Sequence, residues 1–352
     1  MYGEGDSRRR LELDGVSTKV DYPPLSLYEL IPVGRWGRAH VSVAIKATTA
    51  IAEAALVALL WWTSRGHAAS RGAMAGVALW LNPASLMIGS VLGYLDPLFA
   101  LPAVGAVIAA ASMRSALAGA LVAAACLTKP LAIFTIPAVI VGLGQGSDLI
   151  AMRRRVLTAL AAASAVTAIV LVPIAVDGGL RGFALAMGSL LRDPFLSANG
   201  VSIWAPVDAI GVRVPLDAAR AAGAVLTIVT IAWSAAAVRS ARDRWLLAAL
   251  AAFAVHAYTT LAVAVHENHL YLAVPLLALA SAGRPRFTGP FAAVSAIVAV
   301  NLYLAYGFGV DVGFGPPGRI AGVDPLVWLA PINAGAFVWF ARVLRDEAAV
   351  TA

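Results

Sequence analysis

Apolar segments of roughly bilayer length recur from residue 41 to residue 341 of this chain, and they constrain its fold more than any other feature. A helix that crosses the hydrocarbon core of a membrane needs about 20 predominantly apolar residues. Eleven candidate segments, several of them shorter than this, occupy residues 41–63, 73–92, 97–112, 115–128, 131–144, 154–176, 218–238, 245–265, 269–283, 289–309 and 323–341. Only 13% of the residues are charged, whereas soluble domains have about 25%. The sequence therefore predicts an all-α, polytopic transmembrane helix bundle of about 11 spans with no soluble domain.

Basic residues orient these segments, because cytoplasmic connections are enriched in Lys and Arg. One alternating set of connections holds thirteen arginines, whereas the opposite set between the segments holds five basic residues. The first set is therefore predicted to be cytoplasmic. Because Arg114 and Arg153 both belong to it, residues 115–128 and 131–144 must be two helices that meet at Lys129-Pro130, and not one kinked helix.

The same alternation places residues 1–40 on the extracytoplasmic side. This segment is polar and charged, but Pro23-Pro24 precedes a leucine-rich stretch that is typical of a short amphipathic segment on a membrane surface. The predicted organisation is an extracytoplasmic amphipathic loop or tail at 1–40 and a transmembrane bundle at 41–352 with an outer loop at 177–217. Since a charged tail is difficult to export without a helix before it, we expect the natural protein to carry a further, first transmembrane helix.

Charged residues interrupt the apolar sequence on the predicted outer face, at Asp96 in an Asp-Pro turn and at Lys129 before Pro130. Charges so deep in apolar sequence are costly, and by default they mark a functional site that faces the bundle interior or a water-filled cavity. We interpret Asp96 as a candidate base or essential carboxylate, and Lys129 as a cation suited to a phosphate group. The alternatives are a helix cap for Asp96 and a snorkelling side chain for Lys129.

Two further groups of polar residues lie on the same face. His266, Glu267 and His269 are candidates for substrate or phosphate binding, with capping of interfacial helices or zinc binding as alternatives. No third ligand stands at a convincing spacing for zinc, so neither a metal nor another cofactor is predicted. Asn199 and Trp204 of the outer loop are candidates for contact with a sugar, because aromatic rings stack on sugars. A tryptophan at this level is otherwise an interfacial anchor.

Several other activities are disfavoured. The pattern of basic and aromatic residues typical of nucleic-acid binding does not occur, and cytoplasmic loops account for the net charge of +7. A G-x-G-x-x-G match at 313–318 follows no strand and contains two prolines, and no Walker A motif occurs, so ATP-driven transport is disfavoured. Cys126 is interpreted as a small buried hydrophobe. Lys46 and Glu53 lie seven residues apart on one face of the first segment, where we expect a structural ion pair.

The motifs on the outer face occur in an order that resembles a known family. A DYPPL segment at 21–25 is followed by Asn-Pro at 82–83, a G-x-x-D-P turn at 93–97 and Thr-Lys-Pro at 128–130. An N-x-x-x-x-W loop and a VHENHLYLAVP segment complete the series. Together they resemble the integral-membrane GT-C glycosyltransferases that use lipid-phosphate sugars, especially bacterial relatives of the second GPI mannosyltransferase.

The resemblance implies an all-helical bundle in the bacterial cytoplasmic (inner) membrane with its active site facing outside. It implies inverting transfer of a sugar, commonly mannose, from a polyprenyl-phosphate donor to a glycolipid or surface glycan acceptor, with a loop carboxylate as general base. Asp96, Lys129, His266 and Glu267 match acidic, Lys-Pro and His-Glu positions of the family, and Tyr22 matches its Tyr-Pro-Pro segment. Tyr94 stands where the family usually has Gln.

The family also carries a leading catalytic carboxylate just after its first transmembrane helix, and that position has no counterpart here. Asp6, Asp14 and Asp21 are nearby but do not stand in the same sequence context. The alternative functions are a transporter or flippase of lipid-linked sugars and a truncated, inactive scaffold. Broken helices in matching positions of two halves, which are typical of secondary transporters, do not occur in the sequence. The expected partners are the lipid-phosphate donor, the glycan acceptor and membrane lipids, with no nucleic acid.

Overall fold

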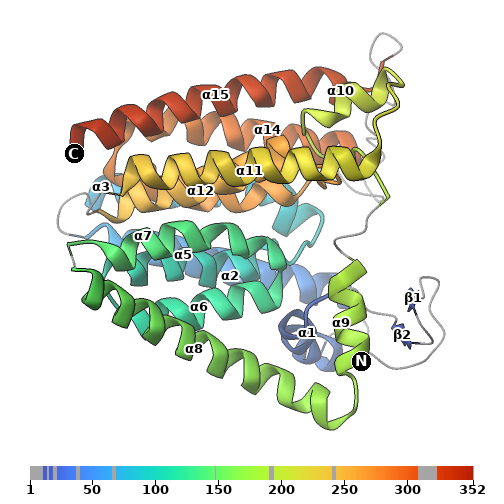
Figure 1. Ribbon diagram of the computed structural model, residues 1–352, viewed down its shortest axis with the longest axis horizontal. Coiled ribbons are helices and arrows are strands. Elements are labelled where there is room, and N and C mark those ends of the chain that lie inside the picture. The colour runs from blue at the N-terminus through green and yellow to red at the C-terminus, as the bar shows by residue number, and fades with distance from the viewer. Residues whose placement is uncertain are drawn as a thin grey trace.

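The computed structural model describes residues 11–13, 16–18, 22–36, 40–65, 69–146, 148–189, 194–239, 243–307 and 323–351 of the chain. Its helices lie side by side in one bundle (Figure 1). Among the described residues, seven helical segments are long and apolar enough to cross a membrane: Val41–Thr63, Ala69–Val91, Leu149–Val176, Leu216–Val238, Arg244–Leu261, Pro285–Tyr306 and Pro325–Val350. Shorter apolar helices cover Asp96–Ala111, Ser115–Thr128, Pro130–Gly144 and His269–Gly283.

These segments correspond to the following elements. The long helices are α2 (Val41–Thr63), α8 (Leu149–Val176), α11 (Leu216–Val238), α12 (Arg244–Leu261), α14 (Thr288–Tyr306) and α15 (Pro325–Thr351). The shorter and interrupted ones are α3 (Ala69–Trp80), α4 (Pro83–Ser85), η1 (Leu86–Val91), α5 (Asp96–Ala111), α6 (Ser115–Thr128), η2 (Pro130–Thr135), α7 (Ile136–Gly144), η3 (His269–Leu272), α13 (Ala273–Gly283) and η4 (Pro285–Phe287).

Over the described residues, each of the eleven predicted apolar segments contains a helix of the structure. The prediction of a bundle of apolar helices is therefore confirmed, and seven helical segments of the described residues are long enough to cross a membrane, while the total of about 11 spans and the GT-C fold stay predictions. The two-helix interpretation of residues 115–144 is also confirmed, because α6 ends at Thr128 and Lys129 is extended, with φ −150° and ψ 124°. Pro130 then starts the separate helix η2, where its missing N–H costs nothing.

The leucine-rich segment after Pro23 forms the short helix α1 (Pro24–Trp36), and its place on a membrane surface stays a prediction. The sequence did not predict the two-stranded antiparallel hairpin of β1 (Leu11–Leu13) and β2 (Val16–Thr18), in which Leu11 pairs with Thr18. The outer loop between α8 and α11 contains α9 (Leu180–Ser189) and α10 (Trp204–Ala209). Asp6, Asp14, Asp21 and the glycine-rich stretch 313–318 lie outside the described residues.

Helices α12 and α13 form the centre of the bundle. In α12, 78% of the apolar span is buried inside the protein, whereas the figure for α8 is only 17%. The outward faces of α8, α11 and α15 expose large apolar side chains such as Ile169, Ile228 and Ile332. In a water-soluble protein such a surface would aggregate, but it is the expected surface of helices that face lipid.

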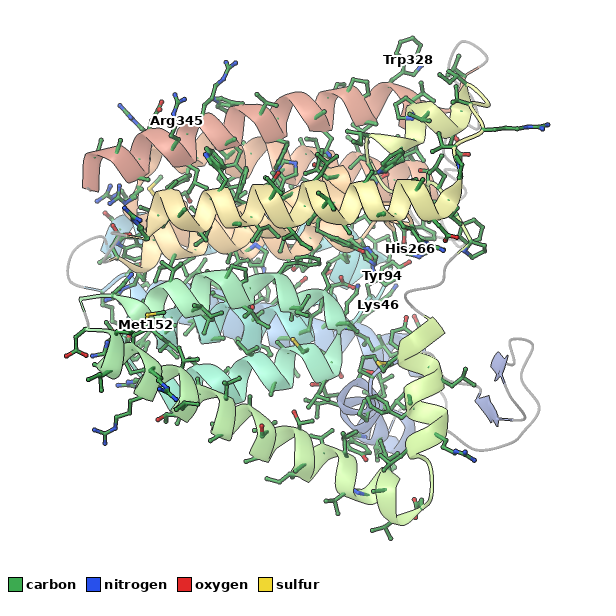
Figure 2. The ribbon with its side chains drawn as sticks, in the orientation of Figure 1. Lys46, Tyr94, Met152, His266, Trp328 and Arg345 are labelled. Carbon is green, nitrogen blue, oxygen red and sulfur yellow. The ribbon has the colours of Figure 1, made fainter. Side chains whose placement is uncertain are left out.

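The two ends of the bundle differ in chemistry. Figure 2 shows Met152 and Arg345 at one end, and Lys46, Tyr94, His266 and Trp328 at the other. At the arginine-rich end, Arg284 bridges Asp243 Oδ2 at 2.5 Å and Glu347 Oε2 at 2.6 Å, which ties the start of α12 to α15. The end with Tyr94 and His266 holds the polar residues that the sequence analysis selected.

Candidate functional site

A buried ion pair lies at the centre of the polar end. Lys129 Nζ is 2.7 Å from Asp96 Oδ1, and Asn268 Nδ2 donates a hydrogen bond of 3.2 Å to Asp96 Oδ2. Asp96 occupies the first turn of α5, and Lys129 caps the C-terminus of α6. Each charge therefore lies at the helix end whose dipole stabilises it. Asp96 is only 2% exposed and Lys129 is 18% exposed, so the pair is largely removed from water.

A cavity of about 110 Å³ adjoins this pair. It is lined by polar groups from four parts of the chain, among them Tyr22, Ser26, Tyr94, Asp96, Thr128, Lys129 and Asn268. Segments that are up to 246 residues apart (22 and 268) thus meet at one concave site. The arrangement combines a cation, a carboxylate and several neutral hydrogen-bond donors, which suits a small, oxygen-rich, anionic group.

Beside the cavity, two tyrosines hold the carboxylate of Glu267. Tyr306 Oη donates to Glu267 Oε1 at 2.6 Å. Tyr94 Oη lies 2.7 Å from Tyr306 Oη and 3.2 Å from Glu267 Oε1, so its single proton bonds to one of them at a time. Burial raises the pKa of Tyr94, and the neighbouring Tyr306 and Glu267 raise it further. Tyr94 therefore remains a neutral hydrogen-bond donor at the cavity wall.

The histidines lie next to each other but form no metal cluster. His269 Nδ1 accepts a hydrogen bond of 3.3 Å from the His266 backbone N–H, and it lies 3.2 Å from Tyr258 Oη. The centres of the His266 and His269 rings are 5.2 Å apart. Within the described residues, no group of three or more His, Cys, Asp or Glu is placed to hold a metal ion. Nδ1 of His269 is thus an acceptor, which places any proton of the neutral ring on Nε2.

The outer-loop candidates lie apart from the residues that line the cavity. Trp204 Nε1 donates to the backbone oxygen of Leu261 at 2.8 Å, which fastens the start of α10 to the end of α12. Asn199 is exposed and adopts a left-handed conformation with φ 60°. Gly200 follows it, and a Cβ there would overlap the backbone of Val265, just before His266. The contact of Asn199 and Trp204 with a sugar stays a prediction.

Lys46 and Glu53 do not form the expected ion pair. Among the described residues, the structure records none between them. The Glu53 carboxylate packs against Gly89 of η1, where its Oε1 is buried without a hydrogen-bond partner. The aliphatic part of Lys46 lies against Gly93, next to the cavity. Both side chains face the segment that follows Asn82, as the seven-residue spacing predicts, but Glu53 meets Gly89 and Lys46 meets Gly93.

One carboxylate near the cavity was not selected from the sequence. Glu29 of α1 accepts a hydrogen bond of 3.2 Å from Thr128 Oγ1. Burial raises the pKa of Glu29 to about 7, against the lowering effect of this bond. The available signal was an acidic residue inside the leucine-rich stretch after Pro24. Thr128 and Tyr306 were also missed, because neutral polar residues in apolar helices carry little signal of their own.

The site therefore brings together the predicted residues Tyr22, Asp96 and Lys129 at one cavity, with Glu267 behind Tyr94. In comparisons with known proteins, no protein-family model and no curated protein matches this chain.

Proposed function

We propose that this chain is a membrane glycosyltransferase that moves a sugar from a polyprenyl-phosphate donor to a lipid-linked or surface glycan acceptor. Mannose is the proposed sugar. The observation that carries the proposal is the cavity at one end of an apolar bundle, in which Asp96 holds Lys129 among neutral hydrogen-bond donors. The reaction is proposed to invert the configuration at the anomeric carbon and to take place on the extracytoplasmic face of the bacterial inner membrane.

The chemistry of Lys129 supports a phosphate as the anionic group. An ammonium group has three N–H donors, and Asp96 engages one of them. A phosphate oxygen accepts from a second, and the Thr128 and Tyr94 hydroxyls lie on the same cavity wall. The ion pair keeps Lys129 extended into the site before the donor binds, which reduces the conformational entropy lost on binding. A fixed cation is also where the charge of a departing phosphate would develop.

The apolar surface of the bundle supports a lipid-linked donor. The helices next to the site expose aliphatic side chains along their length, so a polyprenyl chain can remain among the lipids while its phosphate enters the cavity. A nucleotide sugar would need a larger polar pocket, and nucleotide sugars stay in the cytoplasm. The excess of arginine at the opposite end favours a cytoplasmic location for that end.

The remaining residues receive roles by position. Asp96 is proposed as the essential carboxylate of the site, and Lys129 as the phosphate ligand, with His266, Glu267 and His269 forming the neighbouring polar wall. Tyr22, which is 49% exposed at the cavity, is placed to contact the sugar or the acceptor as it enters. Asn199 and Trp204 are proposed to shape the acceptor side through the loop that rests on Val265.

The proposal is tested by reconstituting the full chain into vesicles with radiolabelled polyprenyl-phosphate mannose and a lipid extract of a bacterial cell envelope as acceptor. We expect label in a new lipid or glycan product. Lys129→Met should abolish binding of the donor, whereas Arg345→Gln, an exposed position at the opposite end, should leave binding and transfer unchanged. A chain that neither binds nor transfers any polyprenyl-phosphate sugar would refute the proposal. Movement of the intact donor across the vesicle membrane without transfer would support a flippase instead.

A further inference from the structure

The contacts of Asp96 make it unsuited to accept a proton from an acceptor hydroxyl. One of its oxygens is 2.7 Å from the Lys129 ammonium, and the other accepts from Asn268 at 3.2 Å. Both oxygens of the Asp96 carboxylate are therefore already occupied by donors, one of them the ammonium group of Lys129. To act as a base, Asp96 would also have to release the cation that stabilises the leaving phosphate. A general base needs a carboxylate oxygen that is not already occupied.

Glu29 has such an oxygen. Its Oε1 accepts from Thr128 Oγ1 at 3.2 Å, whereas its Oε2 is buried and has no hydrogen-bond partner. Residues three apart on a helix share a face, and Ser26, one turn before Glu29, lines the cavity. Thr128 lines it as well and immediately precedes Lys129. Glu29 of α1 is thus joined to the cavity lining through Thr128, while Asp96 and Lys129 line the cavity themselves, from α5 and the end of α6.

Helix α1 is held firmly enough to position a catalytic group. It packs against α2, α6 and α8, and Tyr28 Oη donates to the backbone oxygen of Val170 at 3.2 Å. Ser26 Oγ bonds to the Pro23 backbone oxygen at 2.6 Å, which fixes the first turn after the two prolines. The Glu29 side chain is therefore fixed at both the backbone and the carboxylate.

The environment of Glu29 also tunes its acidity. Burial raises the pKa of this carboxyl to about 7, and the Thr128 bond opposes that rise only in part. The charged groups on the helices packed against α1 are Lys46 and Glu53 on α2, Lys129 at the end of α6, and the arginines 153–155 at the far end of α8. Burial and Thr128, and none of these charges, set the pKa of Glu29. A base is most effective when its pKa is close to the working pH.

We propose that Glu29 is the general base of the transfer reaction. This inference rests on the proposed function. Glu29 Oε2 takes the proton from the acceptor hydroxyl, and the acceptor oxygen forms a bond to the anomeric carbon. The bond between that carbon and the phosphate oxygen breaks, and its electron pair leaves on the phosphate, whose charge Lys129 stabilises. The products are the glycosylated acceptor and polyprenyl phosphate, so atoms and charges balance without a further reactant.

Glu267 is the obvious competitor, since its Oε2 is also buried without a partner. It differs in that its other oxygen accepts from the hydroxyl of Tyr306 at 2.6 Å, and Tyr94 adds a second phenol beside it. Glu267 thus bonds to two phenols, of which Tyr94 lines the cavity, whereas Glu29 bonds to Thr128, which lines the cavity directly beside Lys129 in the chain. Glu267 therefore serves as the comparison residue in the test.

The test measures single-turnover transfer by the reconstituted full chain between pH 5 and pH 9, with donor binding measured separately. For the wild type we expect the rate to rise with pH and to level off above about 7. Glu29→Gln should lower the rate about 100-fold or more and remove the rising limb, because general bases contribute about 10²–10⁴-fold. Donor binding should stay unchanged. Glu29→Asp should restore part of the rate and the pH dependence, and formate should partly rescue Glu29→Ala.

Three results would overturn the inference. Glu29→Gln could keep the wild-type rate and pH dependence, or the rising limb of the pH profile could disappear only in Glu267→Gln. The third such result is an inactive Glu29→Asp variant together with a Glu29→Ala variant that formate does not rescue. Donor binding by the wild type separates these results from failure of the proposed function. If the wild type does not bind the donor at all, the proposed function fails. If it binds and transfers while Glu29→Gln does the same, only the role of Glu29 fails.

Discussion

Removing one partner of the Asp96–Lys129 pair should destabilise the protein more than removing both. Breaking a buried ion pair costs about 3–5 kcal/mol, because the remaining charge has lost its partner in a medium of low dielectric constant. Lys129 is 18% exposed and can turn toward the surface after Asp96→Asn, so we expect a loss at the lower end, about 3 kcal/mol. After Lys129→Met, the buried carboxyl takes up a proton rather than remain charged, which limits that loss to about the same size.

The double variant Asp96→Asn/Lys129→Met replaces the pair by neutral groups of similar volume. It should recover most of the lost stability, to within about 1 kcal/mol of the wild type, because such replacements are often close to neutral. Reversible unfolding in detergent micelles, followed by helical circular dichroism against increasing sodium dodecyl sulfate, gives the free energy of unfolding of each variant. If the losses of the two single variants simply add in the double variant, the two groups do not interact, and the site described here is wrong. The double variant should remain inactive, which separates the role of the pair in function from its role in folding.

Further predictions concern other parts of the molecule. Gly119→Ala should lower the free energy of unfolding by about 1–3 kcal/mol, because the added Cβ would overlap the Ala159 backbone where α6 meets α8. A Cβ at Gly335 would have no atom within 4 Å, so Gly335→Ala should be neutral or slightly stabilising in the same unfolding assay. Asn333→Ala should lower the free energy of unfolding by about 2–3 kcal/mol, because the Asn333 side chain forms hydrogen bonds with Val201 O, Thr260 Oγ1 and His256 Nε2. Limited proteolysis of this variant should show faster cleavage of the outer loop, which the bond to Val201 holds in place. The pKa of Glu29, raised from 4.5 to about 7 in the folded protein, means that the folded state binds more protons than the unfolded state between these values. Its contribution to stability is therefore greatest below about pH 4.5 and is lost as the pH rises through about 7, so Glu29→Gln should flatten the dependence of the unfolding midpoint on pH in this window.

The long-range architecture of the bundle was largely predictable from hydropathy. Segment 41–63 matches helix α2 residue for residue, and the arginine count correctly required two helices that meet at Lys129-Pro130. Both results rest on general physical constraints, since an apolar backbone in lipid must satisfy its own hydrogen bonds, and the residue before a proline, here Lys129, favours the extended conformation that ends α6. The sequence also selected Asp96 and Lys129, because isolated charges in apolar helices are rare.

The pairings within the site could not be read from the sequence. Nothing local in the sequence states that Thr128 meets Glu29, 99 positions earlier, or that Glu267 meets Tyr94, 173 positions away. These contacts depend on how α1 lies across α6 and how α14 lies beside the 93–95 turn. The expected Lys46–Glu53 pair failed for the same reason: helical periodicity gives the face of a residue, but the neighbouring helix decides its partner. The position of Glu267 behind Tyr94 also gives a reason for a tyrosine at position 94.

The length of the helices explains why a polar site forms in such an apolar chain. At 1.5 Å per residue, α5 and α6 extend about 24 Å and 21 Å, which is about 6–9 Å less than the hydrocarbon core of a membrane. The opposite ends of α5 and α6 meet at the turn around Arg114. The length that these helices lack therefore lies at the ends that carry Asp96 and Lys129. The surrounding long helices, α2 and α8 among them, have enough residues to span the full thickness. Helix length thus leaves room for a recess of about one to two helical turns at this end, where the helix ends carry free backbone groups and polar side chains and where the cavity of about 110 Å³ lies. In the proposed reaction, the phosphate of the lipid donor would reach Lys129 at this depth while its hydrocarbon chain stays in the bilayer.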